Sequence, residues 1–287
     1  MGKTDKDGDF SLSTWMWGPS MWALLSAIAE ASDMTRDTSS LCKISRKEDC
    51  KLLQTFFENS LVYILPCNAC KDSYKGFLET SKQRVFKDLA TNTTTLLPNV
   101  FDTLVQSRRV GEVVYHLHNL VNDKLSAVAG EELYHKMGRK CTMEKTAFIN
   151  LYVESQQSSY PSLQIVQKRN MIFYREPVQV DATWMLLLAL AQNIDSTEKR
   201  QAYVLFLSLA SMSLEKFPST NVQMMASALY HASAAAKRDN NLILFDLLMQ
   251  TYLSFDTDVK DPKLTKKHVE MRLFRMKSTQ CSPTSCM

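Results

Sequence analysis

Glycine and proline are scarce in this chain, with 7 and 8 among 287 residues, whereas methionine occurs 15 times. Because turn-rich β proteins draw heavily on glycine and proline, this composition disfavours the sheet classes and favours helices. Hydrophobic residues make up 45% and charged residues 22%, close to the averages for soluble globular proteins, which excludes general disorder and fibrous repeats. We therefore expect an all-α protein with one large domain or two modest ones.

A strong charge of one sign and a long apolar run are also missing. The net charge is only +4 and is dispersed, so it does not indicate a nucleic-acid partner. The longest apolar run, residues 184–191, is far shorter than the ~18 to 20 residues that cross a bilayer. Residues 1–10 are polar and do not resemble a secretory signal. We expect a mobile N-terminus at 1–10 and a soluble protein without membrane or nucleic-acid contacts.

Helical periodicity is the main local signal, and it divides the chain into two parts. A turn to Gln, Ser, Tyr and Pro at 155–161 indicates a boundary between them. We expect a compact four-helix bundle domain at 11–154, a second helical domain of unknown role at 155–277 and a flexible tail at 278–287. The helices are expected at 15–32, 52–64, 67–78 and 100–125 in the first domain, and at 182–191, 198–217, 222–236 and 242–255 in the second.

The seven cysteines are too few for a disulfide scaffold, yet six of them form close pairs. The pairs are Cys42 with Cys50, Cys67 with Cys70 and Cys281 with Cys286, and Cys141 stands alone. Pairing at short spacing is typical of redox or metal chemistry.

Cys67 and Cys70 are the most informative pair, because they lie at i and i+3 just after a proline. In the first turn of a helix they share one face, and the helix N-terminus stabilises a thiolate. A redox pair is the favoured interpretation; two ligands of a zinc site and two buried thiols are the alternatives. Zinc would need a second ligand pair. The candidates for it are Cys42 with Cys50 and His116 with His118, neither at a usual spacing.

Two further motifs flank this pair. The first is Trp17-Gly18-Pro19-Ser20-Met21-Trp22, which opens the first helix and alone indicates a structural role. The second, His118-Asn119-Leu120-Val121-Asn122-Asp123-Lys124-Leu125, gives one helical face an imidazole and two amides beside a cation. Such a face suits a nucleotide with a diphosphate. A polar outer face around a core histidine is the alternative.

In this order and spacing, W-G-P-x-x-W, P-C-x-x-C and H-N-x-V-N-x-K-L closely resemble the Erv/ALR family of FAD-dependent sulfhydryl oxidases, over about residues 11–127. The resemblance implies a four-helix bundle that holds FAD without a G-x-G-x-x-G turn. It implies that Cys67 is attacked during exchange and that Cys70 faces the flavin. The residues implied to bind FAD are Trp17, Gly18 and Trp22 on the flavin side, and His118, Asn119, Asn122 and Lys124 at the adenine and diphosphate end.

These motifs predict a thiol oxidase that forms disulfides in protein substrates. Electrons would pass from a substrate dithiol through the tail pair to the central pair, then to FAD and to molecular oxygen, which gives hydrogen peroxide. The tail pair Cys281/Cys286 is the expected shuttle, and Cys42/Cys50, in the loop before the second helix, is an expected structural staple and the alternative shuttle. No metal is expected.

Two alternatives to this function stay open. Ser26 stands where the family has a histidine, which favours a non-catalytic helical adaptor that has lost FAD. A zinc-binding module is the other alternative. The unmatched extension resembles the enlarged sulfhydryl oxidases of large DNA viruses, which implies a viral protein in host cytoplasm or virion and a homodimer. Kinetoplastid forms of the mitochondrial intermembrane space are the runner-up.

Overall fold

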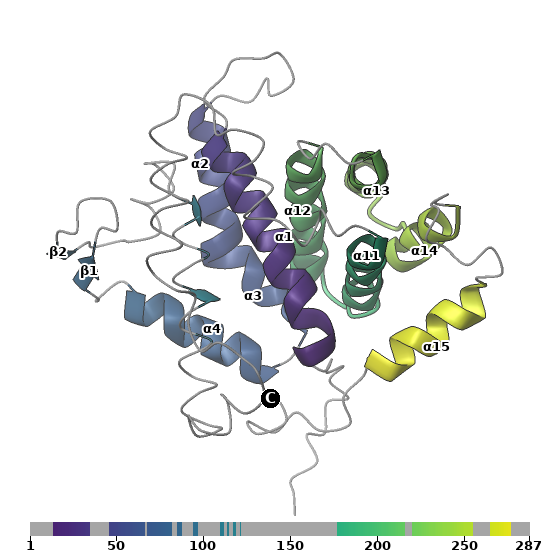
Figure 1. The fold of residues 1–287 in the computed structure, drawn as a ribbon, viewed down its shortest axis with the longest axis horizontal. Helices are drawn as coiled ribbons and strands as arrows, with labels where there is room; N and C mark the ends of the chain where they lie inside the picture. Colours follow the sequence, from purple (N-terminus) through teal and green to yellow (C-terminus); the bar gives the residue numbers. More distant parts are fainter. Residues whose placement is uncertain are drawn as a thin grey trace, which may run out of the picture.

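The computed structural model describes residues 14–34, 46–66, 68–81, 85–87, 94–96, 177–215, 220–254 and 265–276, together with the helical residues 110–111, 114, 117–118 and 121. This part of the chain is almost entirely helical (Figure 1), in agreement with the predicted all-α class. The helices are α1 (Thr14–Met34), α2 (Arg46–Thr55), the π-helix η1 (Phe56–Ser60), α3 (Leu61–Ile64), α4 (Asn68–Ser81), α11 (Pro177–Ala191), α12 (Thr197–Leu214), α13 (Thr220–Arg238), α14 (Leu244–Ser254) and α15 (Lys266–Met276).

The N-terminal helices follow the apolar periodicity of the sequence. Helix α1 confirms the first predicted helix, and its apolar face is buried from Met21 to Ala29. The second predicted helix consists of α2, η1 and α3, which follow one another directly. It begins at Arg46 and not near Leu52, so Cys50 lies within α2; its expected place in the preceding loop was wrong. Polar first turns such as that of α2 carry no apolar periodicity, so the pattern cannot locate their start.

A short two-stranded ribbon follows α4. Strand β1 (Val85–Lys87) pairs antiparallel with β2 (Thr94–Leu96), with Val85 opposite Leu96. No element is expected from the sequence between residues 78 and 100, so these strands were not predicted. Threonine favours extended backbone because its branched side chain fits a pleated surface.

The C-terminal helices begin and end at residues with clear local roles. Helix α11 starts at Pro177, a residue suited to a first helical turn, and therefore earlier than the predicted residue 182. Ser196 caps α12 by accepting a hydrogen bond from the Lys199 backbone N–H at 3.2 Å. Helix α15 was not predicted. Its buried residues Val269 and Leu273 hold it against α11.

One hydrophobic core joins the two parts of the chain. Helix α12 packs against α1, η1 and α3 as well as against α13, and α11 packs against α1; Figure 1 shows α12 beside α1. Phe56 of η1 and Phe206 of α12 are fully buried, and their rings stack with centroids 5.8 Å apart. The expected boundary at 155 lies outside the described residues, and the helices on either side of it share this core.

Among the described helices, none is both long and apolar enough to cross a membrane.

Candidate functional site

The turn between α3 and α4 positions the central cysteine motif. Leu65 is extended, with φ −61° and ψ 128°, as expected of a residue that precedes a proline. Leu65 and Pro66 are both buried, so the chain enters α4 from a fixed point on the core. Helix α4 then begins at Asn68, which accepts a hydrogen bond from Lys71 Nζ at 3.4 Å. The predicted helix at the cysteine pair is confirmed.

Cys70 lies in the first turn of α4. Its side chain is half-buried and packs against the hydrophobic core, and its sulfur is disulfide-bonded. Cys67, the predicted partner, lies outside the described residues. A half-buried disulfide in the first turn of a helix can be reached by a thiolate from one side, which is the geometry that exchange requires.

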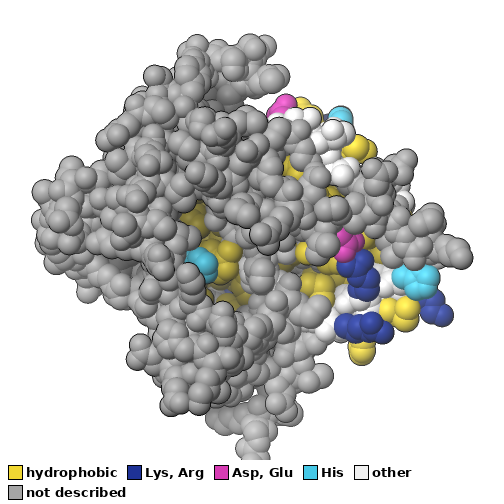
Figure 2. Space-filling model, in the orientation of Figure 1, with side chains coloured by type: hydrophobic (Ala, Val, Ile, Leu, Met, Phe, Trp, Pro, Cys, Tyr) yellow, Lys and Arg dark blue, Asp and Glu magenta, His cyan; other side chains and the backbone are white. Residues whose placement is uncertain are grey.

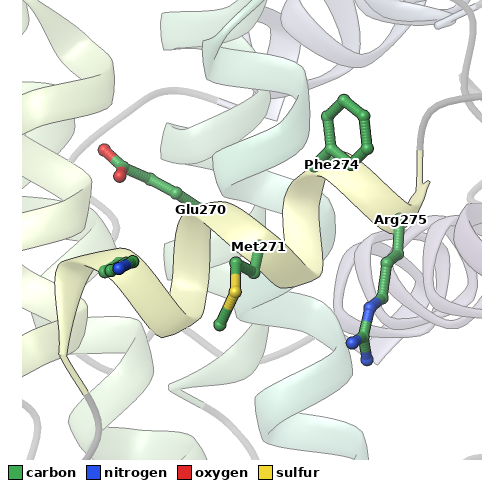
Figure 3. A pocket seen from close by; sticks show the side chains of 5 residues that line it. Glu270, Met271, Phe274 and Arg275 are labelled. Carbon is green, nitrogen blue, oxygen red and sulfur yellow. The ribbon is translucent and has the colours of Figure 1, made fainter.

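Trp22 and His118 are brought together, although they lie far apart in the sequence. Their rings stack with centroids 4.4 Å apart and an interplanar angle of 24°. Burial lowers the pKa of His118 below its ordinary value of 6.5, so the imidazole is neutral near pH 7. On the face of the molecule drawn in Figure 2, one histidine side chain lies beside hydrophobic side chains. Two residues from two separate predicted cofactor motifs therefore form one contact.

Trp17 and Gly18 lie one turn earlier on α1. The Trp17 side chain is 7% exposed, and within the described residues its buried indole Nε1–H has no hydrogen-bond partner. A buried donor without a partner is costly, so this N–H needs an acceptor from outside the described residues. A side chain at Gly18 would meet none of the described atoms within 4 Å. Ser26, at the position where the resemblance implies a histidine, is half-buried on the same helix.

The remaining predicted site residues are not placed by the structure. Cys50 has a described backbone in α2, but its side chain is outside the described set. The others, Cys42, Asn119, Asn122, Lys124, Cys141, Cys281 and Cys286, lie outside the described residues.

Metal ligands do not gather within the described ranges: no three His, Cys, Asp or Glu side chains there could hold one ion. Of the proposed zinc ligands, Cys42, Cys67, His116 and the side chain of Cys50 lie outside the described set, so the zinc alternative is not tested by this observation.

Two features near the site were not found from the sequence. One is the π-helix η1, which ends five residues before Leu65 and so lies close to the cysteine motif. The apolar spacing gives no signal of it, because the buried residues Phe57 and Leu61 are four apart, as in a regular α-helix. The other is the hydrogen bond from Tyr74 of α4 to Phe57 of η1.

No protein-family model, curated protein or solved structure matches this chain.

Proposed function

We propose that this protein is an FAD-linked thiol oxidase that forms disulfides in protein substrates. The observation that carries the proposal is the stack of Trp22 on His118, because it joins the two motifs to which the Erv/ALR resemblance assigns FAD. The disulfide at Cys70 supports the redox role of the third motif. Each motif alone has an ordinary structural explanation. Their juxtaposition is what a cofactor site requires.

The described residues of this region fit a flavin nucleotide. Within the described residues, the buried Trp17 indole N–H lacks an acceptor, and no atom lies within 4 Å of the place that a Cβ would take at Gly18. The neutral His118 and Trp22 provide aromatic surface for stacking. We propose that Asn119, Asn122 and Lys124 complete the site with two amides and a cation for the diphosphate.

The chain's own contribution to the reaction is thiol–disulfide exchange. A thiolate of the reduced partner attacks Cys67 Sγ, the Cys67–Cys70 bond breaks, and Cys70 leaves as a thiolate. The partner's second thiolate then attacks the mixed disulfide, which releases the partner as a disulfide and leaves Cys67 and Cys70 reduced. Bound FAD would supply the two-electron oxidation of this dithiol back to the disulfide, with molecular oxygen as the final acceptor and hydrogen peroxide as the product.

The tail pair is proposed to carry electrons to this disulfide. Helix α15 ends at Met276, and in Figure 1 its C-terminal end is directed toward the side of the molecule on which α4 begins. Cys281 and Cys286 follow within ten residues, and ten residues of extended chain span ~33 Å. Such a reach is enough to serve the chain's own disulfide or that of a second copy.

Peroxide production from dithiothreitol in the presence of FAD tests the redox proposal. The wild-type protein should form peroxide, and Cys70→Ser should abolish it, because the exchanged disulfide is gone. Cys141→Ser is the matched control, since it removes a cysteine that belongs to no pair, and it should retain the activity. A wild-type protein that binds no FAD and forms no peroxide would favour the adaptor, and stoichiometric zinc would favour the zinc module.

A two-substrate comparison tests the shuttle. The double variant Cys281→Ser with Cys286→Ser should oxidise dithiothreitol at the wild-type rate but a reduced protein substrate more slowly. Equal loss on both substrates would contradict a shuttle role. The viral assignment, the location in host cytoplasm or virion and the homodimer stay predictions.

A further inference from the structure

The helical segment before the cysteine motif contains one turn of π-helix. At its end the backbone N–H of Leu61 bonds to the carbonyl oxygen of Phe56, five residues back. In an α-helix the same N–H would bond to Phe57, four residues back. In the π-turn, therefore, the Leu61 N–H does not bond to the Phe57 carbonyl as it would in a regular helix. Single π-turns inside α-helices occur frequently at functional sites.

Tyr74 supplies a donor to that carbonyl. Its hydroxyl donates a hydrogen bond of 2.6 Å to the Phe57 oxygen, and the side chain is 6% exposed. Burial, aided by the nearby carboxylate of Glu58, raises the pKa of Tyr74 far above its ordinary value. The phenol is therefore protonated, and able to donate, at any physiological pH.

This bond ties the redox helix to the π-turn. Tyr74 follows Cys70 by four residues on α4, so the two side chains lie on the same face, one turn apart. On the other side, η1 leads through α3 and the buried Leu65 into the start of α4. The covalent path from η1 through α3 and the Tyr74–Phe57 hydrogen bond therefore both connect η1 to α4, one on each side of Cys70.

We propose that Tyr74 is a positioning residue for the redox pair: by bonding to the Phe57 carbonyl of the π-turn, it holds the first turns of α4 in the geometry that favours the disulfide over the dithiol. The inference rests on the proposed redox role of Cys67 and Cys70. It extends that role by assigning control of the reduction potential to a residue that touches neither substrate nor cofactor.

The chain offers a matched control in Tyr203 of α12. Its hydroxyl donates a hydrogen bond to the carbonyl of Leu187 in α11, also at 2.6 Å, and its side chain is 1% exposed. Both tyrosines are buried donors to a main-chain carbonyl. The difference is that Leu187 lies in a regular α-helix with no cysteine in it. A merely structural role for Tyr74 would make the two tyrosines equivalent.

The test is the equilibrium of the full-length protein with glutathione, read by thiol trapping and by mass spectrometry of the Cys67–Cys70 peptide. In this equilibrium one protein disulfide and two glutathione molecules give the protein dithiol and one glutathione disulfide. We expect Tyr74→Phe to raise the equilibrium constant for reduction about tenfold, equivalent to ~30 mV for a two-electron couple. Tyr203→Phe should leave the constant unchanged.

A stronger donor provides a second variant that preserves the fold. Difluorotyrosine incorporated at position 74 has a more acidic hydroxyl, so it should lower the same constant below that of the wild type. Unchanged constants in both Tyr74 variants, or a shift in Tyr203→Phe as large as in Tyr74→Phe, would overturn the inference. Because the equilibrium needs no flavin, it can be measured even if the protein binds no FAD. A wild-type protein without a Cys67–Cys70 disulfide would instead overturn the proposed function.

Discussion

The N-terminal helices and the C-terminal helices of this molecule share one hydrophobic core but differ in the regularity of their helical hydrogen bonding. Between α11 and α15 the described helices are regular, and side chains satisfy backbone groups at several of their ends. Arg200 of α12, for example, donates to the carbonyls of Ala236, Asp239 and Leu242 at the end of α13. In the N-terminal part the helical ladder is interrupted by the π-turn, and a disulfide and an aromatic stack lie close in sequence to buried core residues.

This difference suggests separate roles for the two parts, with support of the fold in the regular helices and the proposed chemistry in the irregular ones. The fully buried side chains Trp184, Tyr203 and Phe206 belong to the regular helices, and Phe206 packs on Phe56 of the π-turn. The regular part thus supplies a rigid support, and the irregular part carries the proposed chemistry. Variants in the regular part should therefore lose stability and keep the redox function, whereas variants in the irregular part should change the redox function as well.

The largest stability effect is expected from Arg200→Met. Its guanidinium satisfies three carbonyls at a helix end, so its loss should lower the free energy of unfolding by about 2–3 kcal/mol. Chemical denaturation measures the loss, and peroxide production by the folded variant should be unchanged. The neighbouring Lys199→Met is the control. It removes the ion pair between the half-buried Lys199 and the exposed Asp195 and should cost less, ~0.5 kcal/mol.

A smaller effect on stability is expected from the two buried tyrosines. Tyr74→Phe should cost about 2 kcal/mol, because it leaves a buried carbonyl whose helical donor has been diverted. Tyr203→Phe should cost ~1 kcal/mol, because the Leu187 carbonyl lies within the hydrogen-bond ladder of α11. Urea denaturation of both variants decides the order. Equal costs would show that the π-turn makes no difference to the Phe57 carbonyl.

The next effect concerns retention of the cofactor. Trp22→Leu removes the ring that stacks on His118, so FAD should bind about tenfold more weakly, or ~1.4 kcal/mol. Flavin fluorescence titration measures the affinity. Phe245→Leu in α14 makes a similar aromatic truncation at a half-buried position and should not alter it. An equal loss of affinity in both variants would show that general loss of core packing, and not loss of the Trp22–His118 stack, weakens FAD binding.

The smallest effect is a pH dependence at His118. Its pKa in the folded state lies below 6.5, so as the pH falls through this value the unfolded chain binds a proton that the folded state does not. The contribution of His118 to the free energy of unfolding is therefore fully present above about pH 7.5 and declines as the pH falls below this value. Between about pH 7.5 and 5.5 the decline should be up to ~1 kcal/mol, and His118→Gln should reduce it. His231→Gln, at an exposed position on α13, should leave the decline unchanged.

The sequence predicted much of the helical architecture, because apolar periodicity marks long amphipathic elements. Helices α1, α4 and α12 were placed close to their observed bounds. Helix α15 was missed because only Val269, Leu273 and Met276 face the core, among many charged residues. The start of α2 was missed for the same reason, since its first turn is polar.

The candidate site was predicted in part. The family resemblance, not periodicity, associated Trp22 with His118, and the structure places their rings in contact. The π-turn and the Tyr74 bond could not be predicted, because both depend on contacts between η1 and α4 that form only in the folded protein. Likewise, the sequence indicated two domains but not the packing of α12 on α1, which depends on the match of two surfaces.

The absorption spectrum of the purified full-length protein tests the central claim most directly. The account predicts a bound flavin whose visible absorbance bleaches when dithiothreitol is added without oxygen and returns on exposure to air, with no bleaching in Cys70→Ser. A colourless protein that takes up no FAD on reconstitution, or a bound flavin that bleaches equally in the Cys70→Ser variant, would contradict it.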